Sequence, residues 1–142
     1  MDKTDPEITR IVYLTAKALQ VAETPLLISE DLKLEQVSRT LAELLRADVL
    51  RASAARGGTL FIENVERPGY LLLHLDVPIK TDLKSLVFEY LDARDILGPV
   101  APTQFRLHEN HRLALFAYGT MLKLQPADVP RHLLEMCTVI RV

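Results

Sequence analysis

The stretch VLRASAARGGTLFIENVERPGYLLLHLDV, residues 49–77, decides the fold class that this sequence predicts. Within it the apolar residues alternate with a period of two, and the turn signals Gly57-Gly58 and Pro68-Gly69 divide it. Alternation is typical of strands, and such turns supply the backbone angles of tight hairpins. The stretch therefore predicts a three-stranded antiparallel meander with strands at 49–54, 59–65 and 70–77.

Helical spacing of apolar residues flanks the meander on both sides, and most of these segments begin at a capping or proline signal. We expect helices over 4–21, from 29 or 31 to 47, and over 81–97, and a final helix from 125 to the C-terminus. Residues 103–108 and 112–124 predict a two-strand hairpin that turns at 109–111. The expected fold class is α+β: an extra N-terminal helix, then helix, three-strand antiparallel meander, helix, two-strand hairpin and helix.

The composition bounds the class of protein. The chain has 142 residues, of which 49 % are hydrophobic, and its 17 basic and 19 acidic residues leave a formal charge of −2. This length fits one domain, and the balanced charge gives no net attraction for nucleic acid or an anionic membrane. We expect a single domain over 1–142, with an N-terminal helical extension at 1–24 and an α+β core at 29–142.

The N-terminal residues, the lengths of the apolar runs and the cysteine content favour a cytoplasmic location. Positions 2, 3 and 5 are charged, where a signal peptide needs an apolar core. The longest unbroken apolar run, 113–118, is far shorter than the roughly 20 residues that span a bilayer. The single cysteine, Cys137, excludes an internal disulfide and fits a reducing compartment. We therefore expect a cytoplasmic protein with no membrane partner.

The sequence contains no recognisable catalytic or metal-binding motif. Its four serines lack the Gly-x-Ser-x-Gly elbow of hydrolases, and its four histidines are dispersed, so that each is expected to be solvated or hydrogen-bonded. Gly57-Gly58 lies between two expected strands, which favours a hairpin turn over a phosphate cradle. Cys137 is expected to pack as a small buried hydrophobe. We expect no catalytic residue, no metal site and no cofactor, and hence no enzyme.

One segment, residues 28–61, is similar to part of a DNA-binding motif. The run Val37-Ser38-Arg39-Thr40-Leu41 resembles the recognition helix of bacterial winged-helix regulators, and 50–61 would be the wing. This resemblance implies a transcriptional regulator that contacts DNA through Arg39, Arg46, Arg51 and Arg56. An amphipathic helix with exposed arginines explains the same residues, and both interpretations stay open.

A larger part of the chain is similar in layout to the type III secretion chaperone family, whose Tir chaperone fold is shared by the YbjN-like proteins. The resemblance is carried by GYLLLHL at 69–75, LKSLVFEYL at 83–91 and FRLHENHRLAL at 105–115. It implies a homodimer, without ATP or catalysis, whose sheet and first helix offer apolar patches to an extended segment of a secreted effector protein.

Several expected strands are apolar on both faces, which is more surface than the few helices of a small domain can cover. Some of that surface should meet a partner or a second copy, although each of its residues can equally be core. The candidates for partner contact are Val37, Leu41, Leu60, Ile62 and Leu72, and those for a dimer interface are Leu86, Phe88, Tyr90, Leu115 and Phe116. The sequence thus predicts a non-enzymatic binding protein, with the winged-helix regulator as the alternative.

Overall fold

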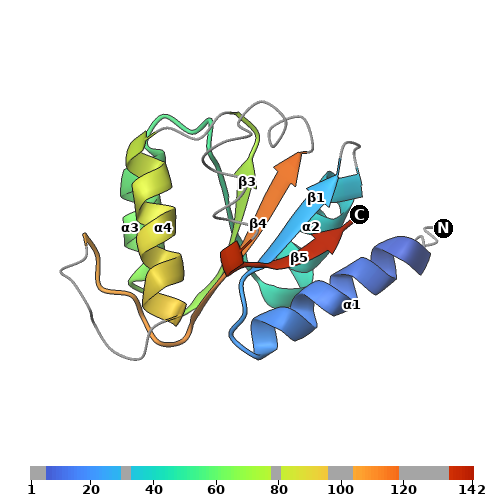
Figure 1. The fold of residues 1–142 in the computed structure, drawn as a ribbon. Helices are drawn as coiled ribbons and strands as arrows, with labels where there is room; N and C mark the ends of the chain where they lie inside the picture. The colour runs from blue at the N-terminus through green and yellow to red at the C-terminus, as the bar shows by residue number, and fades with distance from the viewer. Residues whose placement is uncertain (1–5, 30–32, 78–80, 96–103, 119–134) are drawn as a thin grey trace.

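The computed structural model describes residues 6–29, 33–77, 81–95, 104–118 and 135–142. Within these residues, four helices and five strands alternate along most of the chain (Figure 1). In chain order they are α1 (Pro6–Gln20), β1 (Pro25–Ser29), α2 (Lys33–Leu45), β2 (Asp48–Arg51), α3 (Gly57–Val65), β3 (Gly69–Leu75), α4 (Thr81–Asp95), β4 (His111–Tyr118) and β5 (Thr138–Arg141).

The strands form one sheet in the order β2-β3-β4-β1-β5, and every neighbouring pair is parallel. Parallel neighbours cannot be joined by a tight hairpin, so each connection must cross over the sheet. α2, α3 and α4 lie in such connections. In the described part of the chain, β2 and β5 are the two edges of the sheet.

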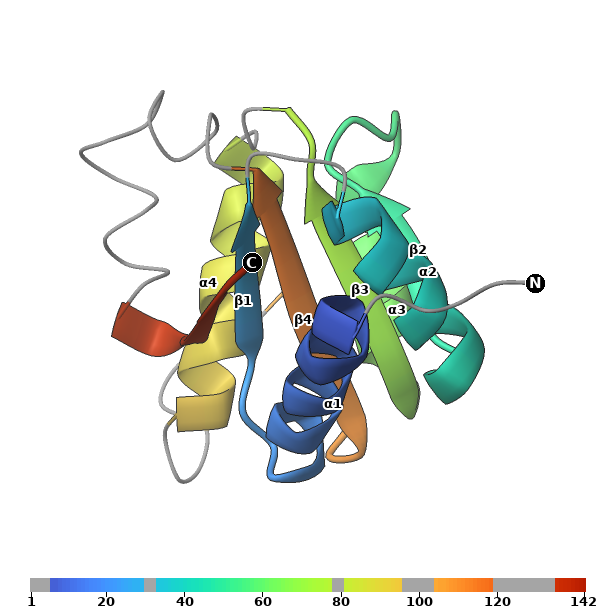
Figure 2. The ribbon, with the colours of Figure 1, turned by 90° about the vertical axis from the view of Figure 1, so that its right-hand side faces the viewer.

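Helices cover both faces of the sheet, which gives the molecule three layers (Figures 1 and 2). α1 and α2 pack together on one face, and α3 and α4 pack together on the other. Side chains alternate between the two layers: Leu72 of β3 meets the α1/α2 layer, whereas Leu71 and Leu73 meet the α3/α4 layer. A strand buried on both sides needs apolar residues at consecutive positions, as β3 has.

Each face has its own apolar core. On the α3/α4 face, the Phe61 ring meets Tyr90 and Phe105 edge-on, with ring centroids 6.2 Å and 6.1 Å apart. On the α1/α2 face, the fully buried residues of α2 follow helical spacing, as do those of α1. The α2 set is Leu34, Val37 and Leu41, and the α1 set includes Ile8, Ile11 and Leu19.

The expected antiparallel meander is wrong, because its middle strand is a helix. Gly57-Gly58 begin α3 instead of turning a hairpin. Phe61 and Val65, four residues apart, are fully buried whereas Leu60 is exposed, which is the spacing of one helix face. β2 and β3 consequently lie side by side in parallel. The fold class is α/β, with an all-parallel sheet, and not α+β.

The expected C-terminal hairpin is wrong as well. Residues 112–118 belong to β4, which pairs in parallel with β3 and β1, and residues 104–110 form no strand. Residues 138–141, expected in a final helix, form β5 beside β1. Residues 135 and 136 are helical, and the rest of that expected helix up to residue 134, like the second half of the expected hairpin strand, lies outside the described residues.

Three expected helices are confirmed as α1, α2 and α4, although Ser29 belongs to β1 and α2 ends at Leu45. Each shows the predicted apolar spacing, and α1 carries the expected proline at its start. β1 was not expected, although its five residues are all buried. It lies between β4 and β5 and therefore belongs to the interior of the sheet.

Candidate functional site

The parallel topology points to the carboxyl edge of the sheet. From β1 the chain continues through α2 to β2 on one side, whereas β5, which follows β4, lies on the opposite side of β1. β1 and β4 therefore form a topological switch point, beside which open α/β sheets usually bind ligands. The segments that follow these two strands, 30–32 and 119–134, lie outside the described residues. Polar side chains with described contacts at this edge come from α2, from β2 and β3, and from the residues that follow these two strands.

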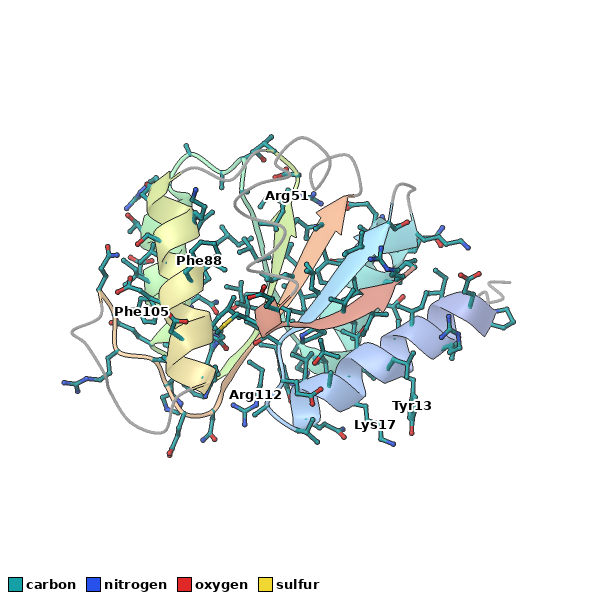
Figure 3. All side chains as sticks on the ribbon, viewed as in Figure 1. Tyr13, Lys17, Arg51, Phe88, Phe105 and Arg112 are labelled. Carbon is teal, nitrogen blue, oxygen red and sulfur yellow. The ribbon has the colours of Figure 1, made fainter. Side chains whose placement is uncertain are left out.

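Six polar side chains gather there, and we name them the carboxyl-edge cluster: Glu35, Ser38, Arg51, Ser53, His74 and Asp76. Figure 3 shows Arg51 at this end of the sheet. Arg51 Nη2 donates hydrogen bonds of 2.9 Å and 3.0 Å to the two carboxylate oxygens of Glu35. This ion pair ties the end of β2 to the first turn of α2. Since both side chains are partly exposed, it adds only about 0–1 kcal/mol to stability.

Asp76, just after β3, braces the loop that follows β2. The Ser53 backbone N–H donates to Asp76 Oδ1 at 3.1 Å, and the Ser53 hydroxyl donates to Oδ2 at 2.6 Å. Both carboxylate oxygens are thus engaged by one neighbouring residue. The contact fixes where the chain leaves β2 before it enters α3.

His74 is the fully buried member of the cluster. Its Nε2 lies 2.7 Å from Ser38 Oγ, and its ring stacks on Phe116 with centroids 4.9 Å apart. Burial, followed by the charge of Arg51, lowers the pKa of His74 against the opposing effect of Glu35 and Asp76. The ring is therefore neutral at pH 7. Among the described residues, its Nδ1 has no hydrogen-bond partner.

The Ser38–His74 pair has the spacing of a nucleophile and its general base but lacks their access. Ser38 is only 4 % exposed and His74 is closed off entirely, so no substrate reaches Oγ in this conformation. No described side chain orients Nδ1 in the way a catalytic triad requires. The pair acts as a contact between α2 and β3.

Exposed apolar side chains lie on the edge strand β2 and on the helices that precede and follow it in the chain. Leu44 in the last turn of α2 is 63 % exposed, Val49 of β2 is 47 % exposed and Leu60 of α3 is 42 % exposed. We name these three residues the β2-edge patch. Ala52 N–H donates to the His74 carbonyl on β3, so strand alternation directs the N–H and C=O of Val49 away from β3. They face the open edge.

A cavity of about 220 Å³ lies between the loop after β2 and the first turns of α3 and α4. Its polar side chains are Arg56, Thr59 and Asp82, and glycine and alanine residues form most of its wall. It is smaller than the roughly 300–1,000 Å³ of ordinary small-molecule sites. We assign no ligand to it.

A second buried polar network lies at the amino edge of the sheet, centred on the fully buried His111. Its Nδ1 is 3.0 Å from the Tyr90 hydroxyl and its Nε2 is 2.7 Å from Asn64 Oδ1. Burial, followed by the charges of Arg94 and Arg112, lowers the pKa of His111 to about 4. Both ring nitrogens have partners, so this network joins α3, α4 and β4 structurally.

Of the residues predicted for partner contact, only Leu60 is exposed. Val37, Leu41 and Leu72 are fully buried on the α1/α2 face, and Ile62 packs partly buried against the other core. The predicted dimer residues are also placed in the core: Leu86, Tyr90, Leu115 and Phe116 are buried and Phe88 is half-buried. Neither set forms a surface.

The arginines of the winged-helix alternative do not share a winged helix. Arg39 and Arg46 are exposed on and just after α2, Arg51 pairs with Glu35, and Arg56 precedes α3. The segment expected to be the wing holds the end of β2 and the first half of α3. The expected wing is therefore wrong.

Sequence reasoning missed the contacts that build the carboxyl-edge cluster. Ser38 and His74 are 36 residues apart, and nothing local to either residue indicates that they meet. The available signal was His74 itself, a polar residue within the apolar run GYLLLHL. The expectation that it is hydrogen-bonded is confirmed. Cys137 is half-buried, and burial raises the pKa of its thiol to about 12, so it is an unreactive packing residue.

Across the described ranges, no helix is both long and apolar enough to cross a membrane. The same residues contain no group of three or more histidine, cysteine, aspartate or glutamate side chains placed to hold a metal ion. In comparisons with known proteins, no family model matches this chain, and no curated protein matches it either.

Proposed function

We propose that this protein is a non-enzymatic binding domain that takes up an extended segment of another protein along the open edge of β2. The β2-edge patch carries the proposal. Its three large apolar side chains are each more than 40 % exposed, and they lie on β2 and on the helices before and after it, while β2 is paired on one side only within the described residues.

Edge strands bind extended chains because they offer N–H and C=O groups in register, while neighbouring side-chain pockets give specificity. Val49 directs both of its backbone groups to the open side. Leu44 belongs to the α1/α2 layer and Leu60 to the α3/α4 layer, so an added strand can bury side chains on both of its faces. The expected occupant is a short segment that is apolar at consecutive positions.

This function keeps the sequence-based expectation of a protein that holds an extended segment, but it rests on other residues. Leu60 is the one predicted contact residue that it retains. A cytoplasmic location remains part of the proposal. A homodimer formed through β2 is the competing occupant, because the same edge can pair with that of a second copy.

The test is the variant Val49→Pro. Proline removes an N–H that faces away from β3, so it blocks an added strand without removing a hydrogen bond inside the sheet. The probe is a phage-displayed library of short random peptides selected on the wild-type chain. We expect the selected peptides to lose at least about tenfold in affinity for the variant, and the Val49 amide to become protected from hydrogen exchange when they bind.

Two control variants make the outcome specific. Val49→Thr keeps the N–H and should keep binding. Tyr13→Ser is the control for loss of an exposed side chain away from β2: it removes an exposed aromatic residue on α1, which Figure 3 shows on the far side of that helix from the sheet. Peptides that bind Val49→Pro as tightly as wild type would refute the proposal, as would a library that yields no binder. Sedimentation that shows a dimer broken by Val49→Pro would replace it with self-association.

A further inference from the structure

Two polar contacts, one helical turn apart, hold α2 on the sheet. Glu35 accepts the hydrogen bonds of Arg51 at the end of β2. Ser38, three positions further along α2, meets His74 of β3. The Glu35 contact is partly exposed to solvent, whereas both members of the Ser38 contact are buried.

The surroundings of His74 suit a neutral ring. A protonated ring carries an N–H on both nitrogens, and Nδ1 has no acceptor among the described residues. Arg51 of β2 adds a positive charge nearby, Glu35 of α2 and Asp76 after β3 add negative ones, and β4 contributes the apolar face of Phe116. A buried charge that neither water nor a hydrogen-bond acceptor reaches destabilises the closed arrangement.

Displacement of α2 is a movement that brings water to His74 while the sheet stays intact. β3 lies between β2 and β4, so the ring cannot leave with its own strand unless the sheet breaks. α2 covers the ring through Ser38 and has only 13 residues. A helix of that length is marginal without its packing.

We propose that Ser38 and His74 form an acid-sensitive latch, which holds α2 on the sheet at neutral pH and releases it before the rest of the fold opens as the pH falls. Release exposes the apolar face of α2 formed by Leu34, Val37 and Leu41. The latch is a regulatory device that goes beyond the proposed binding function and does not rest on it.

The direction of the effect follows from proton linkage. Because burial lowers the pKa of His74 in the closed state, the open state binds a proton more tightly. Opening therefore becomes easier below the ordinary histidine pKa of about 6.5. One proton of difference makes opening at most about tenfold more favourable for each pH unit.

Native-state hydrogen exchange, read by mass spectrometry on the full chain at pH 7 and pH 5, tests the latch. After correction for intrinsic exchange rates, we expect the protection of α2 amides to fall by up to about tenfold per pH unit below 6.5. The amides of α3 and α4 should stay more protected than those of α2 over the same range, because they exchange only when the rest of the fold opens. Equal protection in all helices, or no loss in α2, would overturn the proposal.

Two substitutions assign the effect to one histidine. His74→Gln keeps a neutral hydrogen-bonding group opposite Ser38 but takes up no proton, so the protection of α2 should no longer depend on pH. The matched control His111→Gln removes the other buried histidine, at the opposite edge of the sheet, and should keep the wild-type loss in α2. Wild-type behaviour of His74→Gln would overturn the latch.

A measurement on the wild-type chain decides the question even if His74→Gln fails to fold. The ring signal of His74 and the amide signals of α2 are followed together by NMR from pH 7 into the acid range. We expect one common midpoint below pH 6.5. Separate midpoints for the ring and the helix would overturn the proposal.

Discussion

At the level of single residues, two helices end on a left-handed residue that is not glycine. Ala22 after α1 has φ 63° and Arg46 after α2 has φ 53°. The N–H of Glu23 donates to Ala18 C=O and that of Ala47 to Ala42 C=O, the long hydrogen bond of a Schellman cap. A residue with a side chain costs about 1 kcal/mol in this conformation relative to glycine.

Arg46→Gly should therefore raise the free energy of unfolding by about 0.5–1 kcal/mol, because Arg46 is exposed and its loss removes no packing. Urea denaturation at neutral pH measures the change. Glu43→Gly, on the exposed face of the same helix, is the control and should lower stability by about 1 kcal/mol. A lower stability in Arg46→Gly would show that the cap gains nothing from glycine.

His111 should make the fold sensitive to acid. Its pKa in the folded protein is lowered to about 4, so the stability it supports is complete above pH 6.5 and is lost as the pH falls from there towards 4. The loss amounts to about 3 kcal/mol. Urea titrations at intervals over this range should give a shallower pH dependence for His111→Gln than for wild type. Identical slopes in the two proteins would contradict this account.

At the level of elements, α3 shows where local pattern fails. Its sequence GGTLFIENV is rich in aromatic and branched residues that are common in strands, and no side chain caps its start. The i, i+4 spacing of Phe61 and Val65 was the one local sign of a helix. α3 packs against α4 as a helix, a long-range contact that no local pattern contains. The two helices lie close together, because a Cβ added at Gly58 would lie 3.5 Å from Leu86 Cδ1, in ordinary contact.

Alanine substitutions at neighbouring positions test the face that α3 buries. Phe61→Ala should cost about 3–5 kcal/mol because the ring is fully buried, whereas Leu60→Ala should change stability by no more than about 0.5 kcal/mol. Thermal unfolding followed by circular dichroism gives both values. Similar costs at the two positions would mean that Leu60 is core as well.

The sequence predicts elements here better than it predicts their arrangement. Apolar spacing and capping residues, which are local signals, predict α1, α2 and α4. The strand order depends on pairs such as Leu26 with Leu115, which no short window contains. The two-faced apolarity of the strands leads to the expectation of a partner surface, whereas helices cover both faces of β3, and such apolarity does not state strand direction. The carboxyl-edge cluster depends on that same long-range pairing.

At the level of the whole molecule, the two cores share their strands and should unfold together at neutral pH, where α2 stays on the sheet. Leu71 and Leu72 are neighbours in β3 and face opposite layers. α1 contributes Ile8 and Ile11 to the α1/α2 core and is not separate from it. Loss of either layer exposes strands on which the other layer depends.

Urea unfolding of the full chain at neutral pH should therefore follow one transition. The far-ultraviolet signal of all helices and the near-ultraviolet signal of the tyrosines, among them buried Tyr90, should give the same midpoint. An earlier transition seen only in the far-ultraviolet signal would instead mean that α1 unfolds independently, as an N-terminal extension would.

The position of β1 has a consequence during synthesis. Its five buried residues pair with β4 and β5, and Leu26 precedes its partner Leu115 by about 90 residues. At about 5–20 residues per second, this apolar strand leaves the ribosome roughly 5–20 s before β4 does. A nascent chain that ends before Thr138 keeps one side of β1 unpaired. That unpaired edge is prone to aggregation, and chaperones would have to shield it.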